Sequence, residues 1–562
     1  MRADRKLRVV LCWHMHQPDY RDTGGEFQLP WTYLHAIKDY VDMVAHLEAF
    51  PEARAVVNFA PLLLEQIDDY AQQVREFLDE GRPPRDALLG SLVDVAMPSD
   101  DWKQIGLIRA CLRLHRDRMV APYPAYQRLV EYADWLQNNS DALRYFHSQY
   151  LADLVVWYHL AWIGESVKRT DTRVSRLLEK GSNFDLEDRV ELMQVVGDLL
   201  NGVLPRYRAL ADRGQIELSV TPYAHPIIPL LLDMGSAREA LPDVEMPLLE
   251  AYPGGEQRAR WHIEKGIETF RRHFGRPPAG CWPAEGSISL PTLRLLADAG
   301  FHWAASGGTV LRNSLQASQQ PTSLNRAYRP KNANIACFFR DDGLSDLIGF
   351  TYADWHADDA VADLIHHLEN IAGASMDGSQ DVVSIIMDGE NAWEYYPSNG
   401  YYFVRRLYEW LSRHPRIELT TFSDCLTSDV TVEPLERIVA GSWVYGTFST
   451  WIGDSGKNRA WEMLEDVKRH YDEVVKRGYF DQSHRERIDR QLAVCEGSDW
   501  FWWFGDYNPA DTVSDFEHLY RMNLASLYRL LGVRAPSYLS ESFTHGAGSP
   551  VKGGTMRVST QE

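Results

Sequence analysis

The segment from Val382 to Met387 is an almost continuous apolar run, and Asp388-Gly389-Glu390 follow it directly. Such a run, bounded by charge and glycine, is typical of a strand buried on both faces, as in a parallel sheet. In barrels of parallel strands, the side chains at the carboxyl ends of the strands face the functional site. The segment therefore predicts an α/β fold with Asp388 and Glu390 in a cleft. The alternative is that Asp388 only caps a helix that starts near Pro397.

Further strand patterns recur along the chain and alternate with helical patterns such as 257–274 and 291–299. The predicted strands are Leu7–Trp13, Arg54–Phe59, Ile216–Thr221, Gly280–Ala284, His302–Ala305, Ile335–Arg340, Leu347–Thr351, Asp381–Met387 and Ile417–Phe422. This alternation predicts an α/β architecture with a mainly parallel sheet. The number of strands favours a barrel over an open sheet.

The pattern divides the chain into three regions. Residues 1–430 are predicted to form the barrel, with a helical insertion at about 62–207, where apolar residues recur at three- and four-residue spacing. Residues 431–537 read as a helical region packed on the barrel. Residues 538–562 are rich in Gly, Ser and Thr and lack a core pattern, so we expect a disordered tail.

Composition excludes several classes of protein. The formal net charge of -21 argues against binding to nucleic acid or to an anionic membrane surface. No apolar run approaches the ~20 residues of a membrane span, and the N-terminal apolar run is too short for a signal peptide, so we expect a cytoplasmic protein. The six scattered cysteines indicate neither a disulfide framework nor a zinc cluster. The 18 Trp and 27 Tyr residues suit a cleft that stacks on sugar rings.

Three acidic residues are associated with strands that lie far apart in the sequence. Glu217 lies within its predicted strand, whereas Glu285 and Asp388 follow theirs. Two carboxylates that face each other across a cleft are the minimum for glycoside hydrolysis. One attacks the anomeric carbon or activates water, and the other protonates the leaving oxygen. Glu217 is interpreted as structural.

Taken together, five segments in order resemble glycoside hydrolase family 57. They are His16-Gln17-Pro18, Gly214-Gln215-Ile216-Glu217-Leu218, Cys281-Trp282-Pro283-Ala284-Glu285, Met387-Asp388-Gly389-Glu390-Asn391 and Glu496-Gly497-Ser498-Asp499-Trp500-Phe501-Trp502-Trp503. The resemblance spans residues 8 to about 530. It implies a (β/α)7-type barrel that acts on α-glucans.

The resemblance also assigns roles to the two acids. Glu285 matches the nucleophile of the family, and Asp388 matches its general acid/base. Such enzymes retain the anomeric configuration through a glycosyl-enzyme intermediate, so we expect the two carboxyl groups to lie about 5–5.5 Å apart.

Other residues of these segments are candidates for substrate binding. His16 matches a histidine that lines a sugar subsite in the family, and Gln17, Glu390 and Asp499 lie within the matching segments. His225 follows a strand and is either a partner of a sugar hydroxyl or a packing residue. His14 and His16 point the same way along a strand and could bind a metal. No complementary ligand spacing is evident elsewhere in the sequence, so we expect no metal and no cofactor.

Four tryptophans are candidates for stacking on sugar rings, and core packing is the alternative for each of them. They are Trp282, Trp393, Trp500 and Trp503. For Trp502, core packing is preferred.

Two segments, Ala392–Pro397 and Ile438–Gly453, are similar to the amylopullulanase and α-amylase branch of the family. The resemblance implies a retaining hydrolase that cleaves α-1,4 bonds of glycogen or maltodextrin, with α-1,6 bonds as a further candidate linkage. A 4-α-glucanotransferase or branching-type transferase that uses the same intermediate is the alternative. A catalytically silent carbohydrate-binding barrel is a further one. The sequence does not indicate an oligomeric state.

Overall fold

The computed structural model describes residues 6–98, 100–248, 251–374, 380–428, 430–478, 480–548 and 556–557. Its centre is a ten-stranded sheet in the order β10-β6-β7-β5-β4-β3-β2-β1-β8, with β9 paired to β1. The strands are β1 (Leu7–Met15), β2 (Ala55–Phe59), β3 (Ile216–Val220), β4 (Gly280–Cys281), β5 (Trp303–Ser306), β6 (Ala327–Pro330), β7 (Ala336–Phe339), β8 (Val382–Asp388), β9 (Ile417–Leu419) and β10 (Val432–Leu435). Every pairing in the sheet is parallel except that of β6 with β7.

The sheet closes into a barrel through a contact between β7 and β8. Arg340, directly after β7, forms a parallel bridge with Ser384 of β8, and the backbone N–H of Asp341 donates to the Ser384 carbonyl at 2.7 Å. Within the described residues the ring consists of β1, β2, β3, β4, β5, β7 and β8. The predicted (β/α)7-type barrel is confirmed.

The alternation of side chains along the strands decides what reaches the interior of the barrel. Val10 and Cys12 of β1 belong to a core cluster inside the ring, together with Ile386 of β8. Burying an aliphatic side chain of this kind stabilises the fold by about 1.5–3 kcal/mol. Because successive side chains point to opposite faces, His14 and Asp388 continue the same inward rows at the carboxyl edge of the sheet. They are adjacent in register.

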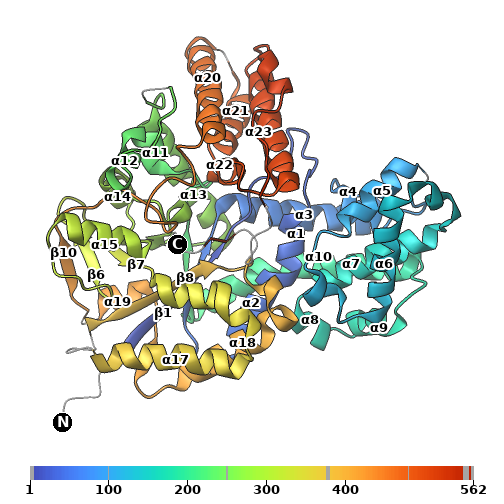
Figure 1. Ribbon diagram of the computed structural model, residues 1–562, viewed down its shortest axis with the longest axis horizontal. Coiled ribbons are helices and arrows are strands. Elements are labelled where there is room, and N and C mark those ends of the chain that lie inside the picture. Colours follow the sequence, from blue (N-terminus) through green and yellow to red (C-terminus); the bar gives the residue numbers. More distant parts are fainter. Residues whose placement is uncertain are drawn as a thin grey trace.

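Helices cover the outer face of the barrel between the strands (Figure 1). They include α13 (Gly255–Phe274), α14 (Leu290–Asp298), α15 (Gly308–Ala317), α17 (Ala357–Ala374) and α18 (Tyr401–Arg413). One strand prediction is wrong: 347–351 is a π-helix that continues α16 (Asp342–Asp346). Asp341 caps α16 through the Leu344 N–H, and a short apolar run after such a cap does not distinguish strand from helix. The strands β6 and β10 were not predicted.

In its described residues, the insertion between β2 and β3 consists of helices joined by loops and contains no strand, so the predicted helical insertion is confirmed. It forms the lobe on the right of Figure 1. Its helices are α3 (Pro61–Glu80), α4 (Ala87–Ser91), α5 (Asp101–Ala110), α6 (Pro124–Asn138), α7 (Ser148–Trp162), α8 (Glu165–Thr170), α9 (Thr172–Lys180) and α10 (Leu186–Asp212). Asp185 begins α10 with a capping box that also uses Asp188.

The C-terminal helical region stands at the top of Figure 1. It consists of α20 (Ser455–Arg477), α21 (Gln482–Cys495), α22 (Ser498–Trp503) and α23 (Ala510–Leu530). Disorder was predicted for residues 538–562. Residues 538–548 instead pack on this region, and the Phe543 ring lies 5.1 Å from that of Phe504. Part of the predicted disordered tail, 549–555 and 558–562, lies outside the described residues.

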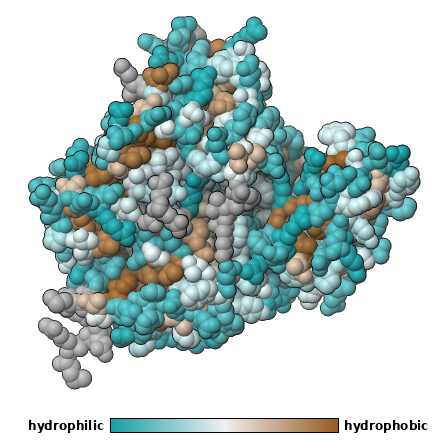
Figure 2. Space-filling view, viewed as in Figure 1, coloured by the Kyte–Doolittle hydropathy of each residue, from teal (hydrophilic) through white to brown (hydrophobic). Residues whose placement is uncertain are grey.

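The molecular face in Figure 2 is mainly hydrophilic, and its hydrophobic residues lie in separate patches. Among the described residues, no helix combines the length and the hydropathy needed to cross a membrane. All six cysteines are free and buried.

Candidate active site

A cavity of about 490 Å³ opens at the carboxyl edge of the barrel. Glu285 and Asp388 both line it, Glu285 from the turn after β4 and Asp388 from the end of β8. In the ring of described strands, β4 and β8 are separated by two strands on one side and by three on the other. The two carboxylates therefore enter the cavity from opposite sides of the barrel.

Glu285 lies on a strained turn. Its backbone is left-handed, with φ 57° and ψ 23°, a conformation that a residue other than glycine adopts only when its surroundings enforce it. Trp443 enforces it twice: its backbone N–H donates to the Glu285 carbonyl at 3.0 Å, and its indole N–H donates to Oε2 at 2.8 Å. Burial, and next the charge of Asp388, raise the pKa of Glu285, while the indole N–H opposes the rise.

Asp388 is placed by its strand. Gly389 follows it, and its N–H donates to the His14 carbonyl at 2.7 Å; a Cβ here would press on the sulfur of Met15, so any larger residue would require the Met15 side chain to move. The Asn391 amide donates to Asp388 Oδ2 at 2.9 Å. Burial raises the pKa of Asp388, and the Asn391 bond opposes the rise.

Glu390 supports the neighbouring loop. Its Oε1 accepts from the backbone N–H of His16 at 3.3 Å and lies 3.5 Å from the Gln17 amide. Burial raises its pKa, with a further contribution from Asp388. Glu390 therefore holds the loop after β1 against the loop after β8.

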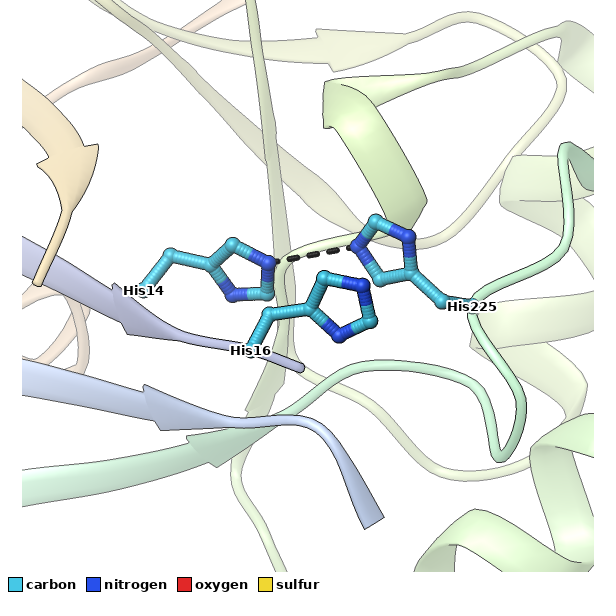
Figure 3. A group of neighbouring side chains, drawn as sticks. All are labelled: His14, His16 and His225. Atoms are coloured by element: carbon cyan, nitrogen blue, oxygen red, sulfur yellow. Dashed lines mark hydrogen bonds between the residues drawn. The ribbon is translucent and has the colours of Figure 1, made fainter. Parts of the chain in front are cut away.

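Three histidines, His14, His16 and His225, form one wall of the cavity (Figure 3). His14 Nε2 and His225 Nε2 lie 3.2 Å apart, and the His14 Nδ1 is hydrogen-bonded to Asn58 at 2.7 Å. Burial lowers the pKa of His14 to about 3 and that of His225 well below its usual value, so both are neutral at pH 7. His16 Nδ1 is buried and has no hydrogen-bond partner among the described residues.

Each of these three histidines has a ring nitrogen within 4.8 Å of a ring nitrogen of the other two, which is close enough for the group to hold a metal ion. Their orientation fits poorly. The rings of His16 and His225 stack face to face, with centroids 3.7 Å apart and planes 13° apart. A nitrogen lone pair lies in the plane of its ring, so two stacked rings do not direct both lone pairs to one ion at about 2.0–2.1 Å. The arrangement fits a hydrogen-bonded cluster.

The short helix α22 brings two more polar groups to this wall. Asp499 accepts from His16 Nε2 at 2.7 Å, and the Ser498 hydroxyl is hydrogen-bonded to His225 Nδ1 at 2.7 Å. Just before this helix, Glu496 is buried in a bidentate ion pair with Arg258. Burial works against ionisation of Glu496, but Arg258 lowers its pKa to about 2. This ion pair anchors the C-terminal region to α13.

The structure brings most of the predicted site residues together. Of the residues predicted for the site, those that line the cavity are His16, Gln17, His225, Glu285, Asp388, Glu390, Asp499 and Trp503. Trp282, Trp393 and Trp500 do not line it: each is at most 1% exposed and lies in the core. Trp393 and Trp500 donate their indole N–H groups to backbone carbonyls. Trp502 is buried but also borders the cavity.

Glu217 lies far from this chemistry. Its carboxylate accepts from the Trp303 indole at 2.7 Å and from the hydroxyl of Ser423 at 2.6 Å. It ties β3 to β5 and to the segment after β9, as a structural residue does.

Sequence reasoning missed several residues of the cavity wall. Trp443 and Arg557 come from segments outside the barrel strands; Trp443 lies in the segment Ile438–Gly453 that resembles the family, but it was not predicted to line the site. Arg557 stacks 5.0 Å over the ring of Trp502 and lowers the pKa of Glu285 through its charge. Arg340 had a usable signal, because it ends a predicted strand as Asp388 does. Its guanidinium lies 5.4 Å over the Trp443 ring.

Solved structures with a similar fold are proteins that differ strongly in sequence. An α-amylase from Thermotoga maritima aligns with a TM-score of 0.59 at 14% identity, covering 95% of each chain. A branching enzyme from Thermococcus kodakaraensis gives 0.56 at 15%, covering 96% of this chain and 92% of its own. A 4-α-glucanotransferase from Thermococcus litoralis gives 0.50 at 13%, covering 93% of this chain and 60% of its own.

A search of curated proteins finds no match to this chain. The sequence model described as glycosyl hydrolase family 57, in contrast, matches residues 10–440, more than three quarters of the chain. That range contains the barrel, both carboxylates and the three histidines. The chain belongs to glycosyl hydrolase family 57.

Proposed function

We propose that this protein is a retaining α-glucan hydrolase that cleaves α-1,4 bonds of glycogen- or maltodextrin-type chains, with α-1,6 bonds as a second candidate linkage, in the manner of the amylopullulanase and α-amylase branch. The observation that carries the proposal is the pair Glu285 and Asp388, which enter one cavity from opposite sides of the barrel. Family membership, and the fold shared with an α-amylase, support it.

In the first step, Glu285 attacks the anomeric carbon while Asp388 gives its proton to the leaving glycosidic oxygen. The indole N–H of Trp443 holds Oε2 of Glu285 and stabilises its ionised form, which leaves Oε1 to form the bond. In the second step, Asp388 takes a proton from water, which attacks the glycosyl-enzyme and restores Glu285. Two inversions give net retention.

The electrostatics favour one proton on the pair but do not place it on Asp388, whose charge raises the pKa of Glu285, so the two roles rest on the match to the family motifs. Each carboxyl has a raised pKa, and the charge of Asp388 raises that of Glu285. Two carboxyls that interact in a buried site hold one proton over a range of pH, because ionising both is costly. One ionised nucleophile and one protonated acid is the state that the first step requires.

Glucan transfer is the second candidate, because a branching enzyme and a 4-α-glucanotransferase share the fold along more than nine tenths of this chain. It uses the same intermediate, and a sugar hydroxyl replaces water.

Incubation with pure maltoheptaose separates the candidates when reducing ends and chain lengths are followed together. Hydrolysis gives new reducing ends and only shorter products. Longer products at a constant number of reducing ends would replace hydrolysis with transfer. An unchanged profile on maltoheptaose and on an α-1,6-linked oligosaccharide would contradict both and favour a carbohydrate-binding barrel.

A further inference from the structure

Two residues near the end of the sequence, Met556 and Arg557, lie in the wall of the catalytic cavity and have no part in the two steps above. The cavity has its volume of about 490 Å³ with both side chains in place, and Glu285 and Asp388 still line it. Met556 and Arg557 therefore form a wall of the site and do not fill it.

Met556 contacts the barrel. It is 8% exposed, and its terminal methyl group lies beside Gly349, where the terminal methyl group of Met387 also lies. A Cβ on Gly349 would stand 3.7 Å from each of these methyl groups. Met387 is the residue before Asp388 in β8. Met556 is therefore next to the end of the strand that carries the acid.

Arg557 contacts the C-terminal helical region. Its guanidinium lies 5.0 Å over the Trp502 ring and 4.6 Å over the Tyr507 ring, and it donates to Asn508 Oδ1 at 2.9 Å. The amide nitrogen of Asn508 donates to the backbone carbonyls of Trp502 and Trp503. Asn508 is 5% exposed, so the loss of Arg557 would take a hydrogen bond from a buried oxygen. The guanidinium is therefore fixed by two rings and a buried amide.

The groups around Arg557 tolerate its charge. The Lys457 ammonium lies 4.9 Å over the ring of Tyr507, so two cations share this side chain. Burial, and next the charge of Arg557, lower the pKa of Lys457 to about 7, and Asp454 opposes the shift. Lys457 is therefore only partly charged at neutral pH, which reduces its repulsion of Arg557.

Arg557 also acts on the nucleophile. The titratable groups that face Glu285 from other segments are Asp388, Asp499, His225 and Arg557. Burial, and next the charge of Asp388, raise the pKa of Glu285, and His225 is neutral because burial lowers its own pKa. Arg557 has the opposite effect to the two acids and lowers the pKa of Glu285. Its charge therefore favours the ionised form that a nucleophile needs.

We propose that Met556 and Arg557 complete the catalytic cavity, and that Arg557 is a positioning residue whose charge keeps the nucleophile Glu285 ionised. Met556 fixes the segment on the barrel, and Asn508 holds the guanidinium on the helical region. The inference rests on the proposed function, because it assumes that Glu285 is the nucleophile. It gives a part in the reaction to residues outside the range 10–440 that matches the family.

The test compares Arg557→Gln, which removes the charge, with Arg557→Lys, which keeps it. Arg459→Gln is the matched control, because Arg459 lies 5.0 Å over the Tyr538 ring and does not line the cavity. In Arg557→Gln the acid limb of kcat/KM should move about half a pH unit to higher pH, because the pKa of Glu285 rises. On the acid side this shift lowers kcat/KM about threefold. The limb should move less in Arg557→Lys and stay in place in Arg459→Gln.

Labelling of Glu285 with a carbodiimide separates this inference from the proposed reaction, because the reagent attacks the protonated carboxyl and needs no turnover. Peptide mass spectrometry measures the labelling of Glu285 as the pH is varied. A midpoint at higher pH in Arg557→Gln, with a smaller shift in Arg557→Lys and none in Arg459→Gln, supports the role of Arg557 even if the wild-type protein cleaves no glucan. An unchanged midpoint in Arg557→Gln, or an equal shift in either of the other variants, would overturn it, whatever the reaction proves to be.

Discussion

The two carboxylates of the site are held in different ways. Asp388 ends β8, a seven-residue strand paired with β1 along its whole length, and its register with His14 fixes where the side chain lies. Glu285 follows β4, a strand of only two residues, on a turn with left-handed backbone. The sheet positions the first acid, whereas hydrogen bonds from distant segments position the second.

This difference has an energetic side. A residue other than glycine in the left-handed region costs about 1–3 kcal/mol, and surrounding contacts must supply that energy. Around Glu285 these contacts are the two bonds from Trp443 and the bond from the Ser306 hydroxyl to the Gly286 carbonyl at 2.6 Å. Substitutions outside the barrel strands should therefore disturb Glu285 more than Asp388.

Removal of each carboxylate gives the largest expected effect. Glu285→Gln should lower kcat by about 10⁴-fold or more, because no nucleophile remains, while the fold is kept since the volume hardly changes. Asp388→Asn should be equally harmful on maltoheptaose but much less so on an aryl maltoside, whose leaving group needs no proton. Thermal unfolding checks the fold. Wild-type turnover in Glu285→Gln would remove the assignment.

Loss of the Trp443 indole N–H tests whether hydrogen bonds from distant segments hold Glu285 in place and keep it ionised. Trp443→Phe removes the N–H that stabilises the Glu285 carboxylate and should lower kcat/KM about tenfold or more, as for a bond to a charged group. The bond lowers the pKa of Glu285, so its loss raises that pKa. Because the nucleophile must be ionised, the acid limb of the pH profile should move to higher pH.

The matched control for this variant is Trp393→Phe. It removes a comparable indole bond, at 2.9 Å to the Gly389 carbonyl beside Asp388. Since Asp388 is held by its strand, the pH profile should keep its shape. Equal shifts in both variants would break the distinction between the two acids.

The Asn391 amide offers the complementary change at the strand-held acid. Asn391→Ala removes the bond that lowers the pKa of Asp388, so this pKa rises. The acid must be protonated, so the alkaline limb of kcat/KM should move to higher pH while the acid limb stays. We expect a change in rate of only a few-fold, the size of one hydrogen bond, at the optimum. A shift of the acid limb instead would reverse the roles.

Two buried serines allow the comparison with the smallest expected effects on stability and activity. Ser306→Ala removes the bond to the turn of Glu285 and should cost about 1 kcal/mol in the free energy of unfolding, with a few-fold loss of activity. Ser384 on β8 is equally buried, but within the described residues its hydroxyl has no partner. Ser384→Ala should therefore leave both quantities unchanged or raise stability. Denaturant titration and initial rates check both variants.

What could be predicted from the sequence follows the same division. The run 382–387 predicted a buried strand, and the period of two then placed Asp388 at the mouth of the barrel. The alternation of strands and helices predicted the barrel and its insertion. These features depend on local patterns that repeat along the chain.

What could not be predicted depends on long-range packing. The segment around Trp443 resembles the family, yet neither it nor the segment around Arg557 shows that these side chains line the cavity, because their places depend on how regions outside the barrel strands dock on the barrel. The same limit explains the tryptophans. Trp393 lies four residues after Gly389, to which it donates, and this bond turns it into the core. Composition alone could not separate it from Trp503, which reaches the cavity.

The most direct test of the central claim is the anomeric configuration of the first products from maltoheptaose, followed by proton NMR before mutarotation. Two carboxyls that act in sequence, with Glu285 as nucleophile, predict that the α-anomer forms first. This holds whether water or a sugar accepts the glycosyl group. If the β-anomer appeared first, a single displacement by water would replace the double displacement, and Glu285 could not be the nucleophile.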